Sequence, residues 1–252
     1  MHRFFIDPKN AEDRIARITG DDVHHINRVL RLKEDDRVSL SNGEGMDFEG
    51  RIVNIDRDEV TVEIEKRFPS EGESDINIKV YQGVPKGDKM ELIIQKSVEL
   101  GVNEIIPVQT ARAVSKIEKG KKMQKKLERW QKISESAAQQ SRRGIIPAVD
   151  RVLSFKELLS EMEKSVSDGE LAVVFFENEE QQPFKDMLKN FKGKDISIII
   201  GPEGGFEDRE IEELMERGVK SASLGKRILR TETVSLAASS IIMYELGDLG
   251  EI

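Results

Sequence analysis

The sequence contains no cysteine and only three histidines, and these two scarcities exclude whole classes of site. A chain without cysteine has no disulfide, no thiolate ligand for a metal and no cysteine nucleophile. Two of the histidines, His24 and His25, are adjacent, and no third ligand for a zinc ion is in view near them. We therefore expect a protein that works without a bound metal.

Long apolar runs are also missing. No run approaches the roughly 20 residues of a membrane-spanning helix, and the opening MHRFFIDPKN lacks the apolar core of a signal peptide. We therefore expect a cytoplasmic protein without a membrane partner. With 252 residues, the chain can bury a sizeable core in one large domain or in two unequal ones.

Charge is abundant but unevenly distributed. The formal net charge is −8, which argues against indiscriminate binding of nucleic acid. Residues 112–143, however, carry eleven basic and three acidic side chains, a balance of +8 that leaves −16 for the rest of the chain. An acidic protein with one basic segment is compatible with an RNA partner that docks locally. The alternative for any single lysine in this segment is a solvated helix face.

Two kinds of hydrophobic pattern divide the chain. Between residues 37 and 67, apolar and polar residues alternate in RVSLS, MDFEGRIVNI and EVTVEIEKR, which is typical of strands joined by tight turns. A short helix is predicted before them, over residues 21–33, and FPSEGESD (68–75) has the composition of a linker. We therefore predict a small β-rich domain over residues 1–70.

Beyond residue 70, strands and helices alternate, which indicates an α/β domain with a mostly parallel sheet over residues 71–252. The segments LAVVFF and DISIII are continuously apolar, as strands buried on both faces of such a sheet are. The predicted strands cover residues 76–84, 104–109, 171–176, 195–200 and 219–224. The predicted helices cover residues 89–101, about 119–140, 208–218 and 233–246.

A glycine-rich turn follows one of these strands in 197-SIIIGPEGGFEDREIEEL-214. Loops at the carboxyl ends of parallel strands bind ligands, and Gly201, Gly204 and Gly205 allow the backbone to approach a ligand closely. The G-P-E-G-G spacing matches neither the dinucleotide-binding fingerprint nor the Walker A loop. Acidic residues also crowd the start of the next helix, where a phosphate would bind. A neutral or cationic ligand therefore suits the turn better than a phosphate. The structural alternative is a plain connection whose acids cap a helix.

A second unusual turn is 224-LGKRILRTETVSLAASS-240, which carries more charge than a plain connection between a strand and a helix needs. Backbone groups from Leu224 to Leu229 can bond a flat heterocycle whose faces touch Ile228 and Leu229. Arg230 and Glu232 are then left to face a reactive centre. The helix that follows has two predicted N-caps, Thr231 and Thr233.

Together, GPEGGF and LGKRILRTET about twenty residues later resemble the paired signature of the SPOUT methyltransferases. The similarity is most specific to the ribosomal RNA small subunit methyltransferase E family, and three further segments extend it over nearly the whole chain. These segments are HHINRVLRLKEDD, KSVELGVNEIIPVQTARAV and RWQKISESAAQQSRR. Two departures are minor: Glu34, Asp35 and Asp36 stand where Gly-Asp is common in the family, and Val234 stands where alanine is usual.

The resemblance implies a small PUA-like RNA-binding β-barrel followed by a trefoil-knotted α/β methyltransferase domain, in a homodimer whose interface completes each site. It implies S-adenosylmethionine as cofactor, 16S rRNA of the small ribosomal subunit as partner, and methylation of a uridine at N3. Three loops are implied to hold the cofactor. Their residues are Phe176, Glu177, Gly201, Glu203, Gly204, Gly205, Leu224, Gly225, Ile228, Leu229 and Thr231.

Methyl transfer from a sulfonium needs alignment of acceptor, methyl and sulfur, but no protein nucleophile. Because uridine N3 carries a proton, we expect Arg230 to stabilise the negative charge that develops on the uracil edge, with Glu232 orienting it. Glu203 is a third catalytic candidate, as a base or as a partner for the sulfonium. The alternative role for Arg230 is a structural ion pair inside the loop.

RNA contacts are expected from the barrel and the basic segment, and the target base is expected to be exposed or flipped. The predicted RNA-binding residues are Arg3, Arg28, Arg31, Arg142 and Arg143. Two other functions stay open at this point. One is a SPOUT ribose 2′-O-methyltransferase, and the other is a catalytically inactive rRNA-binding assembly factor.

Overall fold

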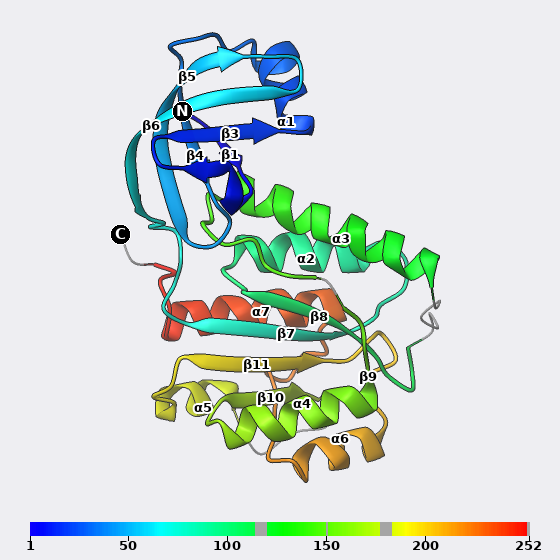
Figure 1. Ribbon diagram of the computed structural model, residues 1–252. Coiled ribbons are helices and arrows are strands. Elements are labelled where there is room, and N and C mark those ends of the chain that lie inside the picture. The colour runs from blue at the N-terminus through cyan, green and yellow to red at the C-terminus, as the bar shows by residue number, and fades with distance from the viewer. Residues whose placement is uncertain (114–119, 150, 177–182, 251–252) are drawn as a thin grey trace. The chain divides into compact units, whose positions relative to one another are not determined.

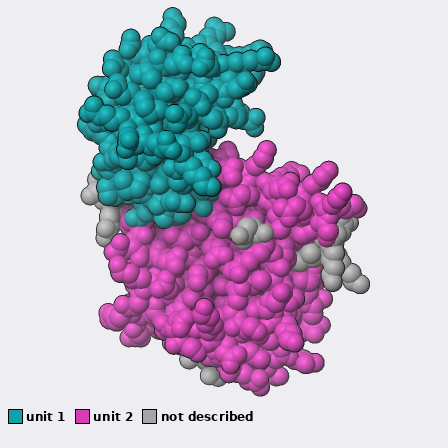
Figure 2. Space-filling model, in the orientation of Figure 1, with its two compact units in different colours: residues 1–73, 138–146 teal, residues 74–137, 147–252 magenta. Residues whose placement is uncertain are grey.

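The computed structural model describes residues 1–113, 120–149, 151–176 and 183–250, and Figure 1 shows their helices and strands. These residues divide into two compact units, coloured teal and magenta in Figure 2. The first unit consists of residues 1–73 and 138–146, so a segment that is distant in sequence completes it. The second unit contains the rest of the described chain. No helix within these ranges is long and apolar enough to cross a membrane.

The first unit is built on a six-stranded sheet with the strand order β1-β4-β5-β6-β3-β2. Neighbouring strands are antiparallel except β1 and β4, which run parallel. The strands are β1 (His2–Phe5), β2 (Ala11–Glu12), β3 (Ile15–Thr19), β4 (Arg37–Ser41), β5 (Met46–Ile55) and β6 (Glu59–Pro69). Alternate residues, such as Val38 and Leu40 on β4, are buried in one core, which explains the alternating pattern of the sequence.

The helix predicted over residues 21–33 forms in two parts, α1 (Asp21–His24) and a π-helical turn, η2 (His25–Leu30). Val23 and Ile26 are buried in the core of the first unit, so one face of this segment anchors it. A 3-10 turn, η1 (Pro8–Asn10), lies between β1 and β2.

The second unit contains a six-stranded sheet of order β12-β10-β11-β7-β8-β9, in which all neighbours are parallel. This confirms the predicted α/β class. The strands are β7 (Asn77–Gly83), β8 (Glu104–Gln109), β9 (Leu153–Ser154), β10 (Leu171–Phe175), β11 (Asp195–Ile200) and β12 (Lys220–Ala222). The described helices are α2 (Lys89–Glu99), α3 (Lys121–Gln140), α4 (Phe155–Ser167), α5 (Phe184–Asn190), α6 (Asp208–Met215) and α7 (Thr231–Glu245).

Helices cover both faces of this sheet (Figure 1). Helix α7 packs on α2, β7 and β11, whereas α4 packs on β8, β9, β10 and α6. With both faces covered, β11 buries consecutive side chains: Ile199 lies in the core under α4 and α6, and Ile198 and Ile200 are also buried. The loops beyond the carboxyl ends of the strands are the part of such a sheet that is left to bind a ligand.

Small residues bring α7 close to α2. The hydroxyl oxygens of Ser97 and Ser235 lie 3.3 Å apart, and both side chains are fully buried. A Cβ atom at Gly101 would lie only 2.7 Å from the Met243 Cε atom. Small residues such as Ser235 on α7 therefore serve packing within the second unit.

Candidate active site

The loops that follow β7, β11 and β12 leave the same edge of the parallel sheet and form the candidate site. Strands β7 and β11 are neighbours in register up to Gln82 and Ile200, so the chain after Gly83 begins beside the glycine turn. A Cβ atom at Gly83 would lie 2.6 Å from Cδ and 2.7 Å from N of Pro202. A side chain at this position would therefore push the turn away from the end of β7.

Thr231 ties the second turn to the first. Its hydroxyl donates to the Gly201 carbonyl oxygen at 2.6 Å and accepts a hydrogen bond from Gln82 Nε2 at 2.9 Å. Both Thr231 and Gln82 are buried. The prediction that Thr231 or Thr233 caps the helix is wrong, because Arg230 occupies the N-cap position of α7 and makes no side-chain cap. The Thr231 hydroxyl joins two loops instead.

The segment between β12 and α7 is open to solvent. Gly225 has a φ of 114°, which disfavours any residue with a Cβ, and Ile228 is 83% exposed. The backbone N–H and C=O groups of residues 226–229 have no hydrogen-bond partner in the part of the chain that the structure describes. This segment therefore offers free backbone donors and acceptors beside an exposed apolar side chain.

Lys89, the first residue of α2, brings two carboxylates of the site together. Its Nζ atom lies 2.9 Å from Oε1 of Glu203 in the glycine turn and 3.4 Å from Oε2 of Glu232 in the first turn of α7. The backbone N–H of Lys86 also donates to Glu203, at 3.2 Å to each carboxylate oxygen. Burial alone would raise the pKa of Glu203, but the hydrogen bonds from Lys89 and from the backbone outweigh burial and lower it.

Arg230 does not join this charged cluster. Its side chain is exposed and makes no hydrogen bond or ion pair with any described residue. Glu232, the residue expected to orient it, pairs with Lys89 instead. The structural ion pair considered for Arg230 thus has no partner within the described ranges, and the guanidinium is available to a ligand.

Two other acids after the glycine turn serve the fold. Glu207 and Glu210 form a capping box at the start of α6, in which the Glu207 N–H donates to Glu210 Oε2 at 2.9 Å. Glu210 Oε1 accepts from the Ala111 N–H at 2.9 Å, and Glu210 is 6% exposed. The structural alternative considered for the acids therefore holds for Glu207 and Glu210. Glu203 instead belongs to the cluster around Lys89.

The loop implied to follow β10 is described only at its start. Phe176 is half-buried, packs against the core under α4 and α6, and donates its N–H to the Ala222 carbonyl oxygen at 3.3 Å. Glu177 lies outside the described residues.

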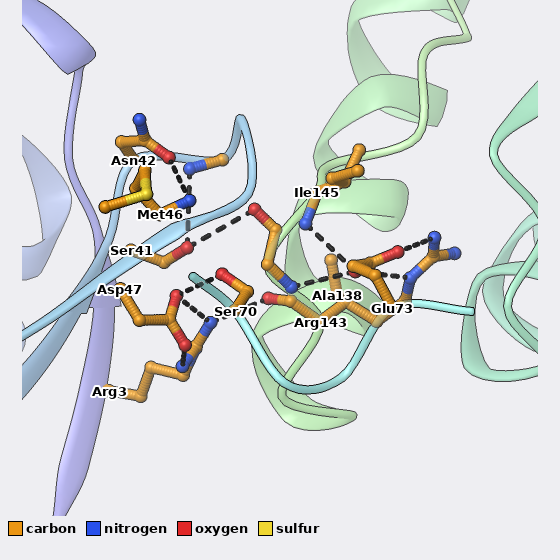
Figure 3. Close-up of polar contacts among 12 residues, drawn as sticks. Arg3, Ser41, Asn42, Met46, Asp47, Ser70, Glu73, Ala138, Arg143 and Ile145 are labelled. Atoms are coloured by element: carbon orange, nitrogen blue, oxygen red, sulfur yellow. Dashed lines mark hydrogen bonds and ion pairs between the residues drawn. The ribbon is translucent and has the colours of Figure 1, made fainter. Parts of the chain in front are cut away.

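Two of the arginines predicted to bind RNA are engaged inside the first unit (Figure 3). Arg3 donates to both carboxylate oxygens of Asp47, at 2.7 and 2.8 Å, and to the Arg143 carbonyl oxygen at 2.9 Å. Arg143 donates twice to Glu73, with Nη2 2.6 Å from Oε2, and it is 3% exposed. Both guanidinium groups are therefore paired with carboxylates inside the fold, and an RNA-binding role for Arg3 and Arg143 stays a prediction.

The other three predicted RNA-binding residues, Arg28, Arg31 and Arg142, are exposed on the first unit. Arg31 and Arg142 have left-handed backbone conformations, with φ of 55° and 61°. Arg31 follows η2 and Arg142 follows α3, so each stands just after a helical segment ends. Their RNA-binding role stays a prediction.

Comparison with known proteins assigns the family. Residues 72–243 match the family model described as RNA methyltransferase domain, and residues 18–65 match the model described as RNA methyltransferase PUA domain. The ribosomal RNA small subunit methyltransferase E of Bacillus subtilis (strain 168) is 38% identical over 97% of this chain and 97% of its own. The chain belongs to the ribosomal RNA small subunit methyltransferase E family.

Two solved structures resemble the whole chain. A family member from Neisseria gonorrhoeae bound to S-adenosylmethionine has a TM-score of 0.86 and 31% identity, covering 98% of this chain and 99% of its own. A putative methyltransferase from Legionella pneumophila in complex with S-adenosylmethionine has a TM-score of 0.84 and 30% identity, covering 98% of each chain. Together with the two family models, these likenesses confirm a PUA-like first domain followed by an α/β RNA methyltransferase domain, and the knot stays a prediction.

Two residues of the candidate site in this chain, Gln82 and Lys89, are not indicated by the sequence pattern. Both belong to the end of β7 or to the loop and helix that follow it. They reach the glycine turn because β7 lies next to β11. The same neighbourhood lets the backbone N–H of Lys86 bond Glu203, which is 117 positions away in the sequence. Strand order was the missing information, and a periodicity along one chain does not contain it.

Proposed function

We propose that this protein uses S-adenosylmethionine to methylate N3 of a specific uridine in 16S rRNA of the small ribosomal subunit. The observation that carries the proposal is the open segment 226–229, with unpaired backbone groups next to the free guanidinium of Arg230. Membership of the family supports an rRNA substrate. The two relatives bound to S-adenosylmethionine support the cofactor.

The residues present fit this cofactor. The adenine of S-adenosylmethionine is a flat ring with donors and acceptors on its edge, and the unpaired backbone of residues 226–229 offers matching groups. Ile228, at 83% exposure, offers an apolar side chain for a face of the ring, and a Cβ at Gly225 would meet no atom within 4 Å. The other proposed contacts are Phe176, Glu177, Gly201, Glu203, Gly204, Gly205, Leu224, Leu229 and Thr231.

When bound, the cofactor supplies an electrophilic methyl group, so the protein needs only to align the uracil and stabilise charge at N3. Arg230 is proposed to donate to the uracil edge and to stabilise the negative charge that develops as N3 loses its proton. The hydrogen bonds of Thr231 to Gly201 and Gln82 hold this turn in place. Glu203 and Glu232 are proposed to favour a cationic sulfonium over the neutral thioether that remains after transfer.

The remaining parts of the proposal concern assembly. We propose that the second unit carries the trefoil knot, that two chains form a homodimer, and that the enzyme acts in the cytoplasm. Sedimentation equilibrium tests the dimer, which requires twice the 28.6 kDa mass of one chain. Arg28, Arg31 and Arg142 are the proposed RNA contacts of the first unit.

Methyl transfer to isolated small ribosomal subunits tests the function directly. The subunits come from cells that lack the modification, the cofactor carries a labelled methyl group, and the product nucleoside is identified by mass spectrometry. Arg230→Ala is the matched variant, with binding of S-adenosylmethionine measured by calorimetry for both proteins. We expect label in N3-methyluridine with the natural protein and a strongly reduced rate with the variant.

Each other outcome has a defined meaning. Label on ribose would make the enzyme a ribose 2′-O-methyltransferase and overturn the proposed acceptor. Absence of both label and cofactor binding would favour an inactive assembly factor. Full methylation by Arg230→Ala, with unchanged cofactor affinity, would remove Arg230 from the mechanism.

A further inference from the structure

Three separate elements meet at one ammonium group in the second unit. Lys89 begins α2, Glu203 lies in the turn after β11, and Glu232 lies in the first turn of α7. The contacts of Nζ, at 2.9 and 3.4 Å, join the two turns implied to hold the cofactor. The proposed function assigns no role to Lys89. Two of the three catalytic candidates, Glu203 and Glu232, nevertheless form ion pairs with Lys89.

An ordinary surface ion pair is worth little, because water screens both charges and the side chains lose freedom. The cluster around Lys89 differs in two ways. Its side chains are 33% (Lys89), 26% (Glu203) and 15% (Glu232) exposed, so water reaches them only in part. Two carboxylates also converge on a single cation, and each would repel the other if that cation were absent.

We propose that Lys89 is a positioning residue that holds the carboxylates of Glu203 and Glu232 in place at the edge of the reaction centre. The inference rests on the proposed function, because it assigns the two carboxylates to that reaction. Their combined negative charge then lies where the glycine turn and the start of α7 meet. That charge is suited to a sulfonium.

The same geometry separates the two roles considered for Glu203. A general base works best when its pKa is near the operating pH. The hydrogen bonds from Lys89 and from the backbone overcome the effect of burial and lower the pKa of Glu203, which makes it a weaker base towards an imide N–H. Glu203 is therefore placed to act as a fixed negative charge rather than as the base that removes the N3 proton.

Other charged groups lie near this cluster, and none replaces Lys89. The Lys86 side chain is exposed, and its backbone N–H is the group that bonds Glu203. Arg112 is exposed and donates to the Gly204 carbonyl oxygen at 3.2 Å. Arg230 is exposed and has no ion pair with a described residue. Asp88 precedes Lys89 at the N-cap of α2 without a side-chain cap bond.

Three variants of the full-length chain test the proposal. Lys89→Met removes the charge and keeps the length of the side chain, whereas Lys89→Arg keeps a charge. Lys96→Met is the matched control, because Lys96 lies on the same helix and, among the described residues, its ion pair is with Glu99, at 2.8 Å. Thermal unfolding of each variant establishes that it folds.

The first readout is the titration of the Glu203 carboxyl carbon by nuclear magnetic resonance in the free protein, assigned with Glu203→Gln. We expect the midpoint to rise in Lys89→Met, because the group that stabilises the ionised form is gone. Lys89→Arg and Lys96→Met are expected to titrate like the natural protein. An unchanged midpoint in Lys89→Met would overturn the proposal.

The second readout is the pH profile of kcat and KM for methylation of small ribosomal subunits. In Lys89→Met we expect kcat to fall about tenfold near neutral pH, the effect of one charge-assisted hydrogen bond. The acidic limb of its profile should move to higher pH, and Lys89→Arg should recover most of the rate. A loss that is equal at every pH would show a merely structural role and would also overturn the proposal. If the natural protein methylates no ribosomal subunit, the proposed function is wrong. The titration still tests whether Lys89 acts on the Glu203 carboxylate.

Discussion

Both units of the molecule bring basic side chains together with carboxylates, but they do so in opposite ways. In the first unit, Arg143 is 3% exposed and its guanidinium donates twice to Glu73, which also accepts from the Gly144 and Ile145 N–H groups. In the second unit, Arg230 is exposed and has no partner among the described residues. The difference separates a charge that is paired within the fold from a charge that the described fold leaves unpaired.

The physical reason is desolvation. A buried guanidinium loses its water and has to recover that free energy from a carboxylate in good geometry, so burial without a partner is not tolerated. An exposed guanidinium keeps its water and needs no partner in the fold. It can exchange that water for the charge of a substrate. Burial and pairing together, rather than charge alone, therefore indicate which arginines to test for function.

The largest expected effect is on the first unit. Arg143→Met should lower the free energy of unfolding by about 3–5 kcal/mol, because it leaves the partly buried Glu73 carboxylate without its cation. Urea denaturation followed by circular dichroism measures this change. If the variant is as stable as the natural protein, the Arg143–Glu73 pair does not stabilise the first unit, and the contrast drawn between Arg143 and Arg230 is wrong.

Arg230→Ala should show the opposite pattern. The methylation rate should fall by about 100-fold, the loss typical of removing one donor to a developing negative charge. The free energy of unfolding should change by no more than about 0.5 kcal/mol, because the side chain has no partner in the described chain. Single-turnover rates and urea denaturation of the same preparation give both numbers. A large loss of stability would mean that Arg230 serves the fold.

Gly83→Ala probes the contact between the end of β7 and the glycine turn. Its Cβ would lie 2.6 Å from Cδ and 2.7 Å from the backbone N of Pro202, so we expect about 1–3 kcal/mol of destabilisation and weaker cofactor binding. Gly193→Ala is the matched control, because its Cβ would lie 2.6 Å from the ring tip of Phe191, which can rotate away. Equal effects of the two substitutions would show that the turn is not held by this contact.

The smallest expected effect comes from the neighbour of Arg143. Arg142 is exposed, and Arg142→Gln should leave stability within about 0.5 kcal/mol of the natural protein. Its binding to small-subunit rRNA should weaken, and the dependence of log affinity on log salt should become shallower by about 1, as loss of one phosphate contact predicts. Filter binding at several salt concentrations measures the slope. An unchanged slope would remove Arg142 from the RNA surface.

The sequence predicts well what depends on local pattern. The continuously apolar segments 171–176 and 195–200 form β10 and β11 within one residue of the predicted bounds, because burial on both faces of a parallel sheet leaves that signature. Helix α4 was not predicted, although Ser154 and Glu157 form the capping box that marks its start. That signal was in the sequence and could have been used.

Long-range pairings could not be predicted. The sequence placed Arg230 and Glu232 together because they are two residues apart, but Glu232 pairs with Lys89, which the strand order brings to it. Nothing local distinguishes Arg142 from Arg143, yet one is exposed and the other is buried against Glu73. Pairing across distant segments depends on the folded topology, so the partners of a charged residue become known only with the structure.

The return of residues 138–146 to the first unit sets the order of events during synthesis. When Glu73 leaves the ribosome, the residues that bind its carboxylate, Arg143, Gly144 and Ile145, have not yet been made. At about 5–20 residues per second, the ribosome needs roughly 3–13 s to reach residue 138 from residue 73. During that interval the first unit lacks residues 138–146, while part of the second unit is being synthesised. The two units therefore complete their folding interleaved, and a fragment that ends at residue 73 corresponds to an unfinished stage of synthesis.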